Sequence, residues 1–264
     1  MKQTDNHLLY KDLEAQALQT VARRYGDDMA ARQGVPEVED LAYHNAHHSR
    51  YVCRAAKRVA DFLRMTGRDR ALAGMIGAAH DVIHESDGQK TAEERSAEWL
   101  VAKMRQYNMD QEDQVIAELA IAGTTPIMSN DGSTMTQRFS QLTFPSERAR
   151  LIALCVAAAD MESLFAAHGP MVAHQLFKEY QHIAYASEPS TLEGLTQFQR
   201  RQVEFVGNFT PLQPEFEELF GGLRQEIVAH QAQILTDIEA GLITTWREVT
   251  ARDDEFMRRH TITI

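Results

Sequence analysis

Apolar side chains recur every three or four residues along most of the chain, which is the period of an amphipathic helix. In residues 5–25, for example, Leu13, Ala17 and Val21 fall on one side. The same spacing predicts further helices, over residues 51–63, 68–83, 91–104, 111–121, 147–164, 171–186, 195–209, 214–240 and about 246–257. No segment stands out with the alternation of apolar and polar residues that is typical of a half-buried strand. The pattern therefore predicts an all-α fold.

One predicted helix is apolar on every side at its centre, residues 71–79, so it belongs in a core. His80 and Asp81 follow this run directly, and Asp160 likewise ends the apolar run of residues 151–159. An ionised carboxylate in such surroundings is very costly without a partner. Because few lysines or arginines lie in these runs, one divalent metal ion would satisfy both carboxylates.

Histidines accompany these carboxylates at a regular spacing. His44 and His48 lie four residues apart, as do His80 and His84, so on a helix each pair would share one face. Taken singly, each is more often a satisfied core histidine, but the joint pattern favours a metal site. Imidazole nitrogen and carboxylate oxygen together suit a divalent ion of manganese, iron, magnesium, zinc, cobalt or nickel, with one or two ions per chain.

Two local features lie between these segments. Thr91 followed by Glu94 predicts a capping box at the start of a helix. Residues 123–146 are polar and rich in turn residues, so they are expected to form a long loop. A lid over the site and an ordinary surface loop are both open interpretations of this segment.

Composition limits the classes of partner. The 264 residues carry a formal charge of -11, which disfavours binding to nucleic acid or to anionic membranes. A small phosphorylated substrate stays open, because a bound metal ion would dominate the local field. The chain shows no signal peptide and no apolar run of about 20 residues that could span a bilayer, so we expect a cytoplasmic protein. Oligomerisation is left open.

The order His48, then His80 and Asp81, then Asp160 resembles the HD superfamily of metal-dependent phosphohydrolases, whose ligands occur in the order H…HD…D. The resemblance implies that these four residues bind the metal. It also implies a helical core over residues 41–163. We therefore expect a single HD-type domain over the whole chain, with additional helices within residues 171–259.

The wording around the first histidines is similar to that of class I cyclic nucleotide phosphodiesterases. Residues 43–52 read Y-H-N-A-H-H-S-R-Y-V, against the family's Y-H-N-x-x-H-A-x-x-V, and residues 80–84 match its H-D-x-x-H. By resemblance, His44 donates a proton to the leaving oxygen and His84 supports the bridging solvent. The family also has an orienting glutamate, for which Glu94 is the first candidate and Glu93 the second. The capping box is an equally good interpretation of Glu94.

Further similarities are shorter. Gln202 and Phe205 match a Q-V-x-F segment in which the glutamine reads the base and the aromatic ring stacks on it. Residues 93–97 instead resemble small bacterial HD phosphohydrolases of unassigned substrate. No histidine lies between His84 and Asp160, which disfavours a di-iron oxygenase site, whereas a second metal could still bind through Asp81 as a bridge.

The sequence therefore predicts hydrolysis of a phosphate ester of a nucleotide or a related small molecule. The alternative is an HD fold that keeps the site but has no activity, and serves instead to sense a nucleotide or to dock a partner protein.

Overall fold

The all-α prediction is confirmed, since the described residues form ten α-helices and very little sheet. The structure is a computed structural model. It describes residues 6–26, 41, 43–85, 88–128, 134–161, 165–172, 175–176, 179, 191–209 and 212–260. Most of the helix predicted over residues 171–186 lies outside these ranges. No described helix is long and apolar enough to cross a membrane.

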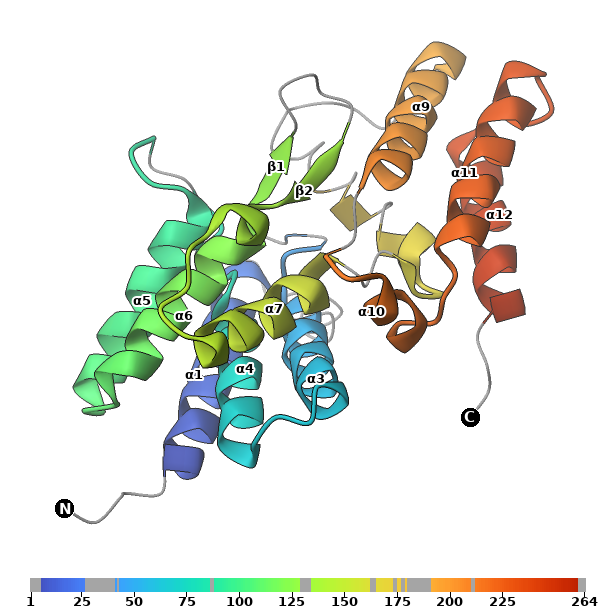
Figure 1. The fold of residues 1–264 in the computed structure, drawn as a ribbon. Coiled ribbons are helices and arrows are strands. Elements are labelled where there is room, and N and C mark those ends of the chain that lie inside the picture. The colour runs from blue at the N-terminus through green and yellow to red at the C-terminus, as the bar shows by residue number, and fades with distance from the viewer. Residues whose placement is uncertain are drawn as a thin grey trace. The chain divides into compact units, whose positions relative to one another are not determined.

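The contacts divide the chain into two units, of which the first is built from residues up to 127 and from residues 136–161. Its helices, shown in Figure 1, are α1 (Asn6–Tyr25), α3 (Ala46–Phe62), α4 (Gly67–Ala79), α5 (Ala92–Gln106), α6 (Gln111–Thr124) and α7 (Glu147–Met161). This unit contains nearly all of the predicted motif core. The single-domain organisation stays a prediction.

Helix α4 lies at the centre of the first unit, as its all-round apolar pattern predicts. Leu72, Met75 and Ile76 are completely buried, and α4 packs against α1, α3 and α7. Gly77 allows the closest approach to α3, because a Cβ atom at this position would lie 3.1 Å from the carbonyl oxygen of Val52. Helix α3, which carries His48, therefore lies in close contact with helix α4, whose end is followed by His80 and Asp81.

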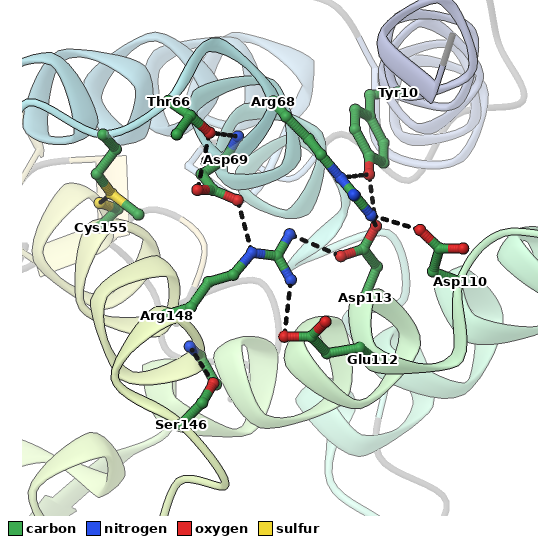
Figure 2. A network of polar contacts seen from close by, with 12 residues as sticks. Tyr10, Thr66, Arg68, Asp69, Asp110, Glu112, Asp113, Ser146, Arg148 and Cys155 are labelled. Atoms are coloured by element: carbon green, nitrogen blue, oxygen red, sulfur yellow. Dashed lines mark hydrogen bonds and ion pairs between the residues drawn. The ribbon is translucent and has the colours of Figure 1, made fainter. Parts of the chain in front are cut away.

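A buried ionic network joins four helices of this unit (Figure 2). The carboxylate of Asp113, which is fully buried on α6, accepts hydrogen bonds from Arg68 on α4 at 2.9 Å and from Arg148 on α7 at 2.8 Å. The hydroxyl of Tyr10 on α1 donates a third bond to it. Burial alone would raise the pKa of Asp113, but these three donors hold it below its usual range. The network thus stabilises the ionised carboxylate inside the bundle.

The predicted loop over residues 123–146 contains some regular structure. Helix α6 continues to Thr124, and two three-residue strands pair with each other before a short 3-10 helix. These elements are β1 (Pro126–Met128), β2 (Met135–Gln137) and η1 (Arg138–Gln141). The side-chain amide of Gln137 donates to the carbonyl oxygen of Ala157 at 2.8 Å, so β2 is tied to the last turns of α7.

The second unit comprises residues 128–135 and the chain from residue 162 onward. Its helices are α9 (Leu192–Asn208), α10 (Pro214–Leu219), α11 (Arg224–Glu239) and α12 (Trp246–His260). The prediction of one helix over residues 214–240 is wrong. Gly221 and Gly222 have φ angles of 120° and 65°, which only glycine adopts readily, and the chain turns there between α10 and α11.

A buried polar cluster holds α9, α11 and α12 together. Gln199 donates to the side-chain oxygen of Gln231 at 2.6 Å, and Gln231 donates to Asp253 at 3.1 Å. His230 contacts the same oxygen of Asp253 at 2.7 Å through Nε2. Hydrogen bonds between buried polar side chains therefore link these three helices.

Candidate metal centre

The first candidate ligand enters from the start of α3. Asn45 is the N-cap of this helix, and its side-chain oxygen accepts hydrogen bonds from the backbone N–H groups of His47 and His48. Its side-chain amide donates to the carbonyl oxygen of Leu41 at 3.1 Å. Asparagine is a favoured N-cap because it satisfies N–H groups that have no partner within the helix. His48 thus lies in the first turn of α3, and His44 precedes the helix.

The next two candidate ligands, His80 and Asp81, lie at the C-terminal end of α4. Helix α4 stops at Ala79, so His80 is its C-cap residue and Asp81 lies in the following turn. The expectation that each histidine pair shares a helical face is therefore wrong. The capping of α3 excludes His44 from the helix, and the end of α4 excludes His84. These histidines nevertheless lie near the ligands, through turns and not through helical spacing.

Four donor atoms from three helical segments converge. Nε2 of His48 lies 3.2 Å from Nε2 of His80, 3.3 Å from an oxygen of Asp81 and 3.4 Å from an oxygen of Asp160. Nε2 of His80 lies 2.9 Å from the same oxygen of Asp81 and 3.5 Å from that of Asp160. Asp160 is in the last turn of α7. The structure therefore brings all four predicted ligands together.

The spacing of these atoms fits a shared metal ion. Ligands held at about 2.1 Å from one ion are about 3.0 Å apart at a right angle and about 3.4 Å apart at the tetrahedral angle. The five donor distances run from 2.9 to 3.5 Å and so cover this range. Hydrogen bonds alone cannot account for all five contacts, because the two Nε2 atoms carry at most one hydrogen each. His48, His80 and Asp160 form a group that could hold a metal ion, with Asp81 beside it.

One hydrogen bond determines which nitrogen of His80 faces the site. Nδ1 of His80 lies 2.8 Å from the carbonyl oxygen of Gly77, which can only accept a hydrogen bond. Nδ1 therefore carries a proton, and Nε2 is directed at the other donors. Metal-binding histidines commonly have this arrangement, in which the remote nitrogen is bonded to a carbonyl or a carboxylate. Gly77 thus orients His80 and also lets α3 approach.

The electrostatics of the four groups agree with a site for a cation. Burial lowers the pKa of both histidines, but the carboxylates of Asp81 and Asp160 raise it above its ordinary value of 6.5, most strongly for His80. Burial raises the pKa of both carboxyls, yet the two imidazoles hold it below its ordinary value of 3.8, most strongly for Asp81. The two carboxylates thus attract protons to the imidazoles, and a metal ion would compete with those protons.

A second pair of histidines lies beside the four donors. The rings of His44 and His84 are stacked with their centroids 4.0 Å apart, and the ring of His44 lies 5.6 Å from that of His48. Both side chains are half-buried. The ring of Tyr43 packs against His44 at 4.7 Å and against His48 at 4.2 Å, and the hydroxyl of Tyr25 accepts a hydrogen bond from the backbone N–H of His84.

The remaining candidates have other surroundings. Glu94 forms the predicted capping box with Thr91, which is confirmed, and its carboxylate lies 3.8 Å from Arg138. Its role as an orienting glutamate stays a prediction, as does that of Glu93. Gln202 and Phe205 lie three residues apart on α9 in the second unit, where both are half-buried. Their role in base binding likewise stays a prediction.

Sequence reasoning missed the residues that orient the ligands. Gly77, Tyr43 and Asn45 act through backbone or ring contacts, which leave no periodic signal. Two indications were present in the sequence: Asn45 is of a residue type favoured at an N-cap, and a glycine lies three residues before His80 in an otherwise apolar helix.

Comparisons with known proteins bear on the fold. No protein-family model matches this chain, and no curated protein matches it. It is similar to a protein from Lactobacillus plantarum, whose crystal structure was a Northeast Structural Genomics target, with a TM-score of 0.51 and 17% sequence identity. The similarity covers 90% of this chain and 98% of that chain. At this identity the likeness concerns the fold alone.

Proposed function

We propose that the protein is a metal-dependent phosphohydrolase of the HD type, acting on a phosphate ester of a small molecule, with a nucleotide as the expected substrate. The observation that carries the proposal is the convergence of His48, His80, Asp81 and Asp160, in that sequence order, at distances that suit one ion. Sequence order, buried carboxylates and donor spacing are three separate properties, and all three favour this class of enzyme.

The metal ion would be divalent, and it would activate water and polarise a phosphoryl oxygen of the substrate. Manganese, iron, magnesium, zinc, cobalt and nickel all accept this mixed set of imidazole and carboxylate donors. Asp81 has two carboxylate oxygens and is the candidate bridge to a second ion. Gln202 and Phe205 are the candidates for contact with the base.

In this proposal His44 protonates the leaving oxygen. Its ring stacks on His84 and lies beside His48, so it is close to the ligands without being one of the four converging donors. General acid catalysis by a positioned histidine typically contributes about 100- to 10,000-fold to the rate. His84 and Tyr43 would hold the ring of His44 in place.

Replacing His44 with alanine is expected to lower kcat by about 100-fold or more, because the leaving oxygen would lose its proton donor. The metal content should stay unchanged. Both are measurable, by turnover of a phosphodiester in the presence of manganese and by elemental analysis. His47→Ala is the matched control, since this histidine is exposed and lies only three residues from His44. Equal loss of metal in His44→Ala would make His44 a ligand and refute the assignment.

The alternative is a protein that binds a nucleotide or docks a partner without turnover. A panel of phosphomonoesters and phosphodiesters, assayed with added manganese, separates the two. Turnover of any of them supports the enzyme. A protein that holds metal and turns over none of them would be the silent module.

Metal affinity is expected to rise with pH through neutrality. The carboxylates of Asp81 and Asp160 raise the pKa of His48 and of His80 above the ordinary value in the metal-free protein, so protons compete with the metal ion for these imidazoles. Titration calorimetry in buffers of different ionisation enthalpy should therefore report proton release upon metal binding at pH 7. Binding without proton release, and with the same affinity at pH 6 and pH 8, would contradict this.

A further inference from the structure

Helices α4 and α7 touch through polar side chains at both ends. Near their first residues, Nε of Arg148 donates to Asp69 at 2.8 Å. Near their last residues, Asp160 lies 3.5 Å from His80. Because the first residues meet the first and the last meet the last, the two helices run in the same direction.

The two contacts are separated by nearly the same number of residues on α4 and on α7. From Asp69 to His80 the chain advances by eleven residues, and from Arg148 to Asp160 by twelve. At about 1.5 Å per residue these spans are about 17 Å and about 18 Å. The ion pair of Arg148 with Asp69 at one end therefore determines how far along the helix axis Asp160 lies relative to His80 at the other end.

The surface between the two contacts is almost entirely apolar, so among the described residues no further charged pair between α4 and α7 lies along it. Helix α7 is buried on nearly all sides, and its second half contains a run of three alanines: Ala157, Ala158 and Ala159. Small apolar side chains pack at several offsets with similar energies, since volume and hydrophobicity alone do not select one arrangement. Buried polar contacts are best attested as devices that select a single register.

We propose that Arg148 is a positioning residue for the metal centre, whose ion pair with Asp69 fixes the register of α7 against α4 and so brings Asp160 to His80. A shift of one helical turn, about 5.4 Å, would remove Asp160 from reach of the ion. Arg148 is also held from α6, where Asp113 accepts a bond from it at 2.8 Å and Glu112 lies 3.1 Å away. Figure 2 shows its guanidinium between the carboxylates of Asp69 and Asp113. The inference rests on the metal centre of the proposed function.

Arg68 provides a matched control. It is on α4, and it bonds to the same buried carboxylate, Asp113, at 2.9 Å, to Asp110 and to Tyr10. Its hydrogen bonds and ion pairs within the described part of the chain go to α1, to α6 and to the cap of α6, but not to α7. Arg68→Met therefore takes one cation from Asp113 and leaves the pair of Arg148 with Asp69 intact.

The test compares Arg148→Met, Arg148→Lys, Asp69→Asn and Arg68→Met with the unmodified protein, loaded with Co²⁺ below the unfolding temperature of every variant. Affinity and the visible absorption spectrum of the bound Co²⁺ are measured, the latter because it reports ligand geometry. We expect Arg148→Met and Asp69→Asn to lower Co²⁺ affinity by about 10- to 100-fold, the range seen when residues that orient metal ligands are lost. The spectrum should change as well, and Arg148→Lys should restore part of both properties.

Arg68→Met should lose stability but keep the Co²⁺ spectrum. Its Co²⁺ affinity should stay within about 2-fold of that of the unmodified protein, because the loss of a positioning residue costs about 10-fold or more. Asp69→Asn preserves side-chain shape, so it keeps the test valid if Arg148→Met does not fold. The inference is overturned if affinity falls in proportion to lost stability in all variants, or if Arg148→Met and Asp69→Asn both bind Co²⁺ normally. Failure of the unmodified protein to bind Co²⁺ would overturn the metal centre itself, and with it this inference.

Discussion

Replacing Asp160 with asparagine should lower the affinity for a divalent metal ion by more than about 100-fold, since it removes a ligand and not merely a group that orients one. The side chain keeps its shape, so packing at the end of α7 is preserved. An amide also removes one of two negative charges that compensate the ion. Mn²⁺ or Co²⁺ titration of protein stripped with a chelator gives the affinity directly, and phosphoester turnover should fall with it.

Asp61→Asn is the matched control for this substitution. Asp61 is exposed near the end of α3 and pairs with Arg70 at 2.6 Å, a surface contact of small energetic value. This variant should bind metal as the unmodified protein does. Retention of full affinity by Asp160→Asn would leave only donors from α3, α4 and the turn after α4 as ligands, and the order H…HD…D would lose its meaning in this chain.

The four ligands could be predicted because each lies beside an unusual stretch of sequence. Asp81 and Asp160 follow runs of apolar residues in which a lone carboxylate is hard to explain. The local geometry could not be predicted in the same way. The four-residue spacing suggested that His44 and His84 share a helical face with His48 and His80, whereas the cap at Asn45 and the end of α4 leave both outside the helices. Turn conformations depend on hydrogen bonds that a periodic pattern does not report.

Replacing Asp113 with alanine is expected to destabilise the first unit by about 3–5 kcal/mol, the cost of breaking a buried ion pair by removing one partner. Two guanidinium groups and the Tyr10 hydroxyl would lose their common acceptor at once. Urea unfolding, followed by circular dichroism, measures the free energy. Asp110→Ala is the control, because Asp110 pairs with Arg68 at the surface and should contribute less than about 1 kcal/mol.

The difference in unfolding free energy between the unmodified protein and Asp113→Ala is expected to depend on pH. The pKa of Asp113 is lowered in the folded protein, so its stabilising effect is present above the unfolded-state pKa of about 3.9 and is lost as the pH falls through the folded value. The difference in unfolding free energy between the unmodified protein and Asp113→Ala should therefore be constant from pH 7 to about pH 5 and shrink below about pH 4. A difference that stays constant down to pH 2 would show that Asp113 acts through packing and not through charge.

This network was not predictable from the sequence. Asp113 lies in the first turn of α6, where acidic residues are common because of the helix dipole, and Arg148 lies in the first turn of α7 among other charged residues. Their hydrogen-bond partners lie 35 to 103 residues away in the chain. Only the packing of α4, α6 and α7 brings them together, and no local pattern contains that information.

The order of the ligands along the chain has a consequence for how the protein folds. During synthesis, α3 and α4 emerge well before α7 and can pair locally through the close approach at Gly77, which brings His48 to His80 and Asp81. Asp160 is made much later and arrives only when α7 has docked. A metal ion present from the beginning would bind the early half-site weakly and the finished site tightly. It would thereby favour those nascent chains in which α7 has found its correct partner, and so serve as a check on assembly before it serves any chemistry.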